Sequence, residues 1–310
     1  MRNNFAKELS QICSDDDKVL LLSGDIGNRL FDDIKKITDF QFINCGIAEQ
    51  SMMGMAAGLA LSGFKPVVYT ITPFVTYRCF EQIRIDVSYH EAPVVIVGTG
   101  SGLSYASLGP THHSMEDIAI LRTLPSLIIF CPSGPDEVRA GLKKAINNKS
   151  PVYIRLGKKG EKSLHNSQPE IEFGKAICMR QGSDSCIIGT GPILANCIAV
   201  SDKLLEQGFS IRVENFHTIK PLDYEKLSEI CATFSELVIV EEHGKIGGLF
   251  SAISEYISEN KEISCKLSSV SSEDRFLHVI GSQDIARKSY GITDEKIEEK
   301  VKASLQGSTR

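Results

Sequence analysis

Short apolar runs, each about the length of a β-strand, recur along the chain with helix-like segments between them. In the first half these runs are Val19–Leu22, Phe40–Ile43, Pro66–Thr70, Pro93–Thr99, Leu127–Cys131 and Pro151–Arg155. In the second half they are Ser185–Gly189, Ser210–Glu214, Leu237–Glu241 and Cys265–Val270. Continuous apolar strands are typical of parallel sheets covered by helices on both faces. The sequence therefore predicts an α/β protein with two domains, each a mainly parallel sheet with helices on both faces.

A polar and charged stretch, Gly157–Glu170, interrupts this alternation of strands and helices. Interdomain linkers have this composition, and 310 residues are enough for two ordinary domains. We therefore expect a first domain over residues 1–160, a linker over residues 161–171 and a second domain over residues 172–310.

Composition argues against several classes of protein. The net charge is −5 and the lysines and arginines are scattered among acids, so we expect no nucleic-acid partner. The apolar runs are far shorter than a membrane span, and the first residues have no apolar signal-peptide core. The nine cysteines form no Cys-x-x-Cys pair, which favours reduced thiols over a disulfide frame or a zinc site. We expect a cytoplasmic protein without membrane contact.

Glu49 occupies a position where a carboxylate can carry chemistry. It lies in the stretch Asn44–Gln50, between a short apolar segment and a helix of small residues, Ser51–Ala60. The alternative is structural, because an acidic residue in the first turn of a helix interacts favourably with its dipole, by about 0.3–1 kcal/mol. Glu49 alone does not decide between the two.

Two further polar stretches follow predicted strands. The glycine-rich loop Gly100–Gly109 leads into Thr111, His112 and His113, and Arg155 to Lys159 follow another strand. Ligands of parallel sheets bind outside the carboxyl ends of the strands, which are the places where Glu49 and both stretches are expected. A surface or capping role is the alternative for the histidine pair. Neither histidine has a neighbour at metal-ligand spacing, so we predict no metal site in this chain.

Phe74, Tyr77 and Phe80 are three residues apart on a predicted helix from Pro73 to Tyr89, which places them on roughly one face. Packing in the core is the alternative for these rings. The segments Ser23–Asn28 and Gly98–Gly102 lack the spacing of phosphate-binding loops, so nucleotide binding is rejected.

Four of these segments together resemble the C-terminal half of transketolase. They are Gly46–Gln50, the aromatic helix from Phe74, Gly109–His112 and Pro151–Arg155. Their order and spacing resemble the transketolase pyrimidine-binding domain followed by the transketolase C-terminal domain, and the resemblance covers nearly the whole chain. Similar motifs occur in deoxyxylulose phosphate synthase and in the β subunits of 2-oxoacid dehydrogenases.

The resemblance implies thiamine diphosphate as cofactor and a role for each matching residue. Glu49 matches the glutamate that bonds the aminopyrimidine ring and shares a proton with its ring nitrogen. Phe74, Tyr77 and Phe80 match positions that line the pyrimidine pocket, and His112 matches a histidine beside the reacting carbons. On the same basis Lys158 approximately matches a phosphate-gripping arginine of the synthase, and Arg155 is a second substrate-binding candidate. Solvated charges at the start of the linker are the alternative for both.

The resemblance also implies a partner subunit. Full-length relatives have an N-terminal domain in which Gly-Asp-Gly and a later Asn hold Mg²⁺ and the diphosphate, and Gly24–Asn28 does not fit that pattern. We therefore expect the C-terminal subunit of a split transketolase, which moves a two-carbon ketol unit from a ketose to an aldehyde. The diphosphate-binding subunit would supply the Mg²⁺ ligands, in a heterotetramer with two copies of each subunit.

Two departures from the family pattern concern the substrate. At the position of Leu108, transketolases usually have an acidic residue that recognises a hydroxyl group of the acceptor sugar. At the position of Gly100 they have a histidine. A buried hydroxyl left unpaired costs about 1–3 kcal/mol, so we expect an unusual or deoxygenated sugar as substrate. Partner residues that replace both contacts are the alternative.

Three other functions stay open. Val240–Gly248 is similar to the synthase branch, and a 2-oxoacid dehydrogenase β subunit is a further enzymatic possibility. A non-catalytic assembly subunit is the possibility from another class.

Overall fold

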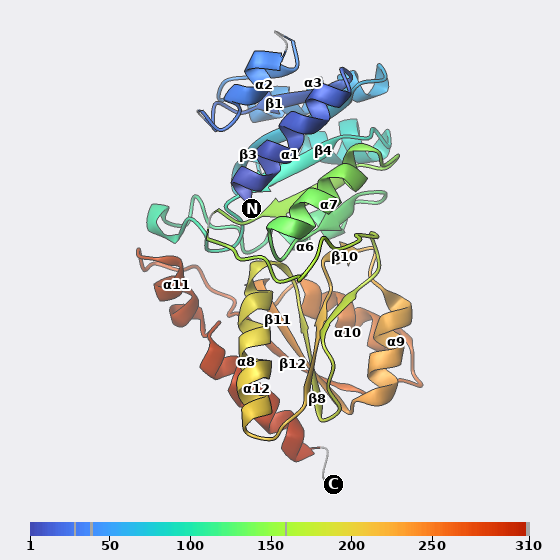
Figure 1. Cartoon of the computed structure of the whole chain (residues 1–310), viewed down its shortest axis with the longest axis vertical. Coiled ribbons are helices and arrows are strands. Elements are labelled where there is room, and N and C mark those ends of the chain that lie inside the picture. Colours follow the sequence, from blue (N-terminus) through green and yellow to red (C-terminus); the bar gives the residue numbers. More distant parts are fainter. Residues whose placement is uncertain (28, 38–39, 159, 308–310) are drawn as a thin grey trace.

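The computed structural model describes residues 1–27, 29–37, 40–158 and 160–307 of the chain. Asn28, at the end of a rejected phosphate-loop candidate, Lys159, after the sixth predicted strand, and residues 308–310 lie outside the described residues. The chain forms two β-sheets, which follow one another along the long axis of the molecule, and helices cover both of them (Figure 1). The predicted α/β class with mainly parallel sheets is confirmed.

The first sheet has seven strands in the order β10-β5-β6-β4-β3-β1-β2. Its parallel strands are β1 (Val19–Ser23), β2 (Phe42–Asn44), β3 (Lys65–Ile71), β4 (Val95–Thr99), β5 (Ile128–Phe130) and β6 (Val152–Leu156). Every residue of β1, β4 and β6 is buried, which is why the sequence reads these strands as unbroken apolar runs.

Helices follow the strands of the first sheet as the alternating pattern predicts. They are α1 (Arg2–Asp15), α2 (Asp32–Ile37), α3 (Glu49–Leu61), α4 (Thr72–Thr76), α5 (Phe80–Gln82), α6 (Asp117–Arg122) and α7 (Pro135–Ile146), with a π-helix at Ile83–Tyr89. Helices α1 and α7 lie side by side on one face of the sheet (Figure 1). Helix α7 begins with Pro135, whose fixed φ suits the first helical turn.

The second sheet has five strands in the order β12-β11-β8-β9-β7. Its strands are β7 (Ile177–Arg180), β8 (Ser185–Gly189), β9 (Ile211–Asn215), β11 (Glu236–Gly244) and β12 (Lys266–Ser272), of which β7 is antiparallel to β9. The helices of this half are α8 (Leu194–Glu206), α9 (Tyr224–Thr233), α10 (Leu249–Glu259), α11 (Gln283–Tyr290) and α12 (Asp294–Gly307). Helices α8 and α12 pack together, and α12 also contacts β8, β11 and β12.

The two halves of the chain share structure across the predicted linker. Strand β10 (Thr218–Lys220) comes from the second half, yet it pairs antiparallel with β5 and becomes an edge of the first sheet. One hydrophobic cluster also runs through both halves, from Val68 and Ile96 to Ile219 and Leu237. The second half therefore packs firmly against the first sheet.

None of the helices in the described part of the chain is long and apolar enough to cross a lipid bilayer. All nine cysteines are free thiols.

Candidate functional site

Glu49 is the first residue of α3, directly after the loop that leaves β2, and only 2% of it is exposed. Its carboxylate accepts a hydrogen bond of 2.6 Å from Nη1 of Arg78, whose side chain is 44% exposed. A Cβ at Gly24 would lie 3.1 Å from the Thr70 hydroxyl oxygen and 3.5 Å from Cγ of Glu49. The Thr70 hydroxyl is buried and makes no hydrogen bond within the described residues. A buried carboxylate and an unpartnered hydroxyl thus flank a position without a side chain.

A row of charged and aromatic side chains leads away from Glu49. Arg78 lies over the Phe74 ring, 4.5 Å from Cζ to the centroid, and the Phe74 and His112 rings meet edge to face at 5.3 Å. The His112 and Tyr105 rings are 6.1 Å apart, and Nζ of Lys158 lies 4.3 Å from the Tyr105 centroid. We call these six residues, in the order Glu49, Arg78, Phe74, His112, Tyr105 and Lys158, the Glu49–Lys158 row. The row collects residues from the carboxyl ends of β2, β3, β4 and β6.

His112 is half-buried in this row. Its Nδ1 lies 2.9 Å from the Thr111 hydroxyl, and partial burial, together with the neighbouring His113, lowers the pKa of His112. A neutral imidazole at neutral pH has one nitrogen free to accept a proton and one N–H to donate. His113 is buried, and its Nε2 has no hydrogen-bond partner within the described residues.

The aromatic trio does not share one helix face. The predicted continuous helix from Pro73 to Tyr89 is wrong, because α4 ends at Thr76 and α5 begins at Phe80. The Tyr77 hydroxyl donates to Glu116 at 2.7 Å, and its ring lines an interdomain cavity of about 370 Å³. Phe80 is partly buried and packs against the large hydrophobic cluster. Of the three rings, Phe74 is the one that the structure brings together with Glu49, through Arg78.

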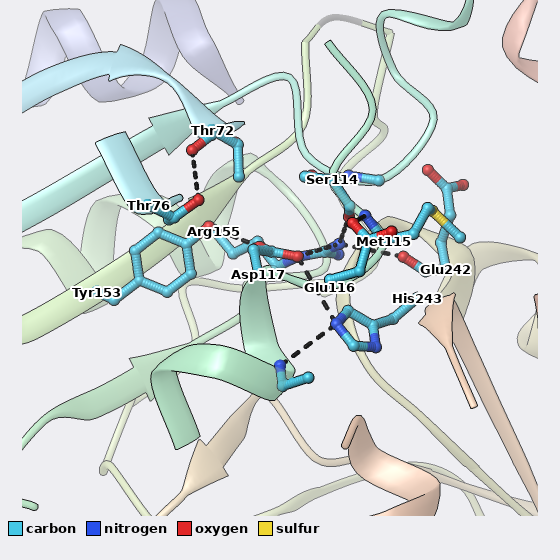
Figure 2. Close-up of polar contacts among 12 residues, drawn as sticks. Thr72, Thr76, Ser114, Met115, Glu116, Asp117, Tyr153, Arg155, Glu242 and His243 are labelled. Carbon is cyan, nitrogen blue, oxygen red and sulfur yellow. Dashed lines mark hydrogen bonds and ion pairs between the residues drawn. The ribbon is translucent and has the colours of Figure 1, made fainter. Parts of the chain in front are cut away.

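Arg155 takes part in a buried network between the two halves of the chain (Figure 2). It is 3% exposed, and its Nε donates to Asp117 at 2.8 Å. Its Nη2 donates to the carbonyl oxygens of Ser114 at 2.8 Å and Glu242 at 3.1 Å. The alternative that Arg155 is a solvated charge is therefore wrong. Its contacts favour a structural role over the predicted substrate contact.

His243 and Glu242 reach this network from β11. The imidazole Nε2 of His243 accepts a hydrogen bond from the Ala119 amide at 3.4 Å, and burial lowers the pKa of His243 to about 4. The Glu242 carboxylate accepts from the Leu103 amide at 2.7 Å and from Arg287 of α11. Glu242 thereby ties the loop before His112 to the second domain.

The two positions that depart from the family pattern lie in this loop. Leu108 ends a short 3₁₀ turn, Ala106–Leu108, and is 51% exposed. Gly100 follows β4 with φ of +75° and lies against the Tyr105 ring.

Sequence reasoning missed three residues of the site: Arg78, Tyr105 and Glu242. Arg78 is 29 residues from Glu49 and Glu242 is 139 residues from Leu103, so no local spacing links either pair. Tyr105 carries no motif. The one signal for Tyr105 is its position in a loop that follows a strand, because ligands of parallel sheets bind there.

Comparisons with known proteins agree with this architecture. Residues 1–160 match the family model described as "Transketolase, pyrimidine binding domain", and residues 174–297 match "Transketolase, C-terminal domain". The chain is 34% identical over 261 residues to a subunit of the apulose-4-phosphate transketolase of Phocaeicola vulgatus, covering 84% of each protein. It is 31% identical over 300 residues to the 6-deoxy-6-sulfo-D-fructose transketolase subunit SqwH of a Clostridium species, covering 96% of this chain and 92% of that protein.

A solved structure titled "Split gene transketolase, inactive beta4 tetramer" superposes with a TM-score of 0.88 at 32% identity and covers 98% of this chain and 97% of its own. Both family models, the relatives and the solved structure therefore agree over most of the sequence. The chain belongs to the transketolase family, and its matched residues carry that family's pyrimidine-binding and C-terminal domains.

Proposed function

We propose that this chain is the C-terminal subunit of a split, thiamine diphosphate-dependent transketolase, which transfers a two-carbon ketol unit from a ketose to an aldehyde. The observation that carries the proposal is the Glu49–Lys158 row. It aligns a buried carboxylate, an aromatic ring, a half-buried imidazole and a lysine along one edge of the sheet. The relatives matched over most of their length are transketolase subunits, so the synthase-like alternative is the weaker fit.

The residues present fit the pyrimidine half of the cofactor. When bound, thiamine diphosphate would supply the carbanion chemistry needed for ketol transfer. Glu49 would hold a proton at the ring nitrogen, and Phe74 would contact the ring with its aromatic face. Gly24 leaves room beside Glu49, and the unpartnered Thr70 hydroxyl is available as a further contact.

The remaining roles follow the row outward from Glu49. His112, neutral because its pKa is lowered, would donate to or accept from the oxygen atoms of the reacting sugar. Lys158 would bind an anionic group of the substrate. Tyr77 and Phe80 are predicted pocket residues that the described contacts favour less than Phe74.

A diphosphate-binding partner completes this proposal. Within the described residues no group of three or more His, Cys, Asp or Glu side chains is arranged to hold a metal ion. The Mg²⁺ ligands would come from the partner, in a heterotetramer with two copies of each subunit. Both relatives are named as subunits of a transketolase, which supports a divided enzyme.

The substrate we propose is an unusual sugar rather than an intermediate of central pentose metabolism. Leu108 lacks a polar atom for an acceptor hydroxyl, and Gly100 lacks a side chain. The names of the two relatives, which refer to apulose 4-phosphate and to a sulfonated deoxyfructose, support a specialised substrate.

Reconstitution tests the assembly. The chain alone should show no ketol transfer with thiamine diphosphate and Mg²⁺, whereas the chain co-purified with a diphosphate-binding subunit should form a complex with cofactor-dependent turnover. Mass measurement by light scattering gives the stoichiometry. Full turnover by the isolated chain would contradict the need for a partner, and an assembled complex without any turnover would favour the non-catalytic alternative.

A further inference from the structure

Gly100 and Tyr105 occupy the same space in the loop after β4. A Cβ built on Gly100 would lie 1.8 Å from Cε2 of Tyr105 and 2.0 Å from Cδ2, well inside van der Waals contact. Gly100 also has φ of +75°, in the region that glycine adopts without strain. Any side chain at position 100 would therefore displace the Tyr105 ring, so the glycine is what makes room for the aromatic residue.

Tyr105 is itself 9% exposed and has a charged and an aromatic neighbour. Nζ of Lys158 lies 4.3 Å from its ring centroid, and the His112 ring meets it at 66° with centroids 6.1 Å apart. The face of an aromatic ring attracts an ammonium group. Lysine has a flexible four-carbon stem, so this contact restricts where its charge lies before any ligand binds.

We propose that Tyr105 is a positioning residue that sets substrate specificity by fixing the Lys158 ammonium at one distance from His112. This rests on the proposed function, in which sugar carbons react beside His112. The substrate class it selects is a sugar with a terminal phosphate or sulfonate, held at a set separation from the reacting carbonyl. The ring, rather than the hydroxyl, performs this role.

The test compares anionic and neutral ligands on the assembled enzyme. With hydroxypyruvate as ketol donor, the measured quantity is the ratio of kcat/KM for D-glyceraldehyde 3-phosphate to that for D-glyceraldehyde. A second arm uses sulfoacetaldehyde against glycolaldehyde, which separates phosphate from sulfonate recognition. Calorimetric binding of glycerol 3-phosphate against glycerol gives the same ratio without turnover. Absence of all turnover would therefore count against the proposed function, while binding still decides the role of Tyr105.

The wild type and Tyr105→Phe should prefer the anionic ligand to the same extent. Tyr105→Leu keeps apolar bulk without an aromatic face, and Tyr105→Ala removes the ring, so both should lose about tenfold or more of this preference. Gly100→Ala should show the same loss, because its methyl group displaces the ring. Tyr89→Ala, which removes an exposed tyrosine (77% exposed), is the matched control.

A double variant tests whether Tyr105 acts through Lys158. Lys158→Met should abolish the preference, and adding Tyr105→Leu should reduce it no further. Thermal unfolding identifies any variant that fails to fold, and Tyr105→Leu then replaces Tyr105→Ala. The proposal would be overturned if Tyr105→Leu kept a preference for the anionic ligand within about twofold of the wild type. It would also be overturned if Tyr105→Leu lowered this preference as much in the Lys158→Met background as in the wild type.

Discussion

The Arg78 guanidinium holds the Glu49 carboxylate at 2.6 Å, across the junction between α3 and the turn that follows α4. Arg78 also covers the Phe74 ring, so one cation contacts both residues that we propose to bind the pyrimidine half of the cofactor. A carboxylate in this ion pair has one oxygen already engaged. If Glu49 binds the cofactor ring as we propose, Arg78 would have to move or to share Glu49 with the ring.

Glu49→Gln should lower the turnover rate strongly without unfolding the chain. The amide keeps the shape of the side chain but cannot share a proton with the ring nitrogen, so kcat should fall about a hundredfold or more. Because Arg78 is half exposed, loss of the ion pair should change the free energy of unfolding by less than about 1 kcal/mol. Steady-state kinetics at saturating cofactor and a thermal melt measure both. Glu81→Gln, on an exposed side chain of α5, is the control, and near-normal turnover of Glu49→Gln would contradict the assignment.

Phe74→Ala and Phe80→Ala should have different effects. Phe74 contacts Arg78 and His112, so its loss should weaken thiamine diphosphate binding about tenfold, with little effect on melting temperature. Phe80 packs on the hydrophobic cluster, so its loss should lower the melting temperature and leave cofactor affinity nearly unchanged. Cofactor titration of the assembled enzyme and thermal melts separate the two. Equal loss of affinity in both variants would restore Phe80 to the pocket.

Leu108→Asp should improve the use of hydroxylated acceptors. The wild type should turn over ribose 5-phosphate and xylulose 5-phosphate poorly, because Leu108 offers no hydrogen-bond acceptor. An aspartate there should raise kcat/KM for ribose 5-phosphate about tenfold, the scale of one regained hydrogen bond to a charged group. Leu108 is 51% exposed, so the folded state should tolerate the change. Steady-state assays with Leu108→Asn as a neutral comparison give the answer. If the wild type used ribose 5-phosphate and xylulose 5-phosphate efficiently, Leu108 would carry no information about the substrate.

Two buried groups should give opposite pH dependences of stability. Burial raises the pKa of Glu241 to about 7, so between pH 7 and 4.5 the folded chain holds a proton that the unfolded chain releases, and acidification stabilises the fold. Burial lowers the pKa of His243 to about 4, so between pH 6.5 and 4 the unfolded chain binds a proton that the folded chain lacks, and acidification destabilises it. These contributions largely offset each other.

Glu241→Gln removes the first contribution and leaves the second. Between pH 6.5 and 4.5 the variant should lose on the order of 2 kcal/mol of unfolding free energy relative to the wild type. Urea unfolding at several pH values measures this, with the exposed Glu259→Gln as control. Parallel curves for Glu241→Gln and the wild type would mean that Glu241 is ionised throughout this range.

The strands were predictable because their signal is local. Residues Ser185–Gly189 were predicted as a strand and form β8 with the same bounds. All five residues are buried, so the segment appears in the sequence as a continuous strand-like run. Strand β7 was missed because it lies at a sheet edge, where its residues are only partly buried and the apolar signal is weak. Strand β10 was missed because it is only three residues long and two of them, Thr218 and Lys220, are polar. Strand β10 also pairs with a strand about 90 residues earlier, a relationship that no local pattern carries.

The sequence by itself determined the α/β class, the order of the motifs and the candidates Glu49, Phe74 and His112, because apolar periodicity and motif spacing are properties of the chain. Tertiary structure alone decided which candidates meet. It directed Tyr77 to Glu116, buried Arg155 against Asp117 and laid Tyr105 between His112 and Lys158. The physical reason is that side-chain partners in a parallel sheet are set by which strand ends become neighbours, and that depends on the strand order of the whole fold.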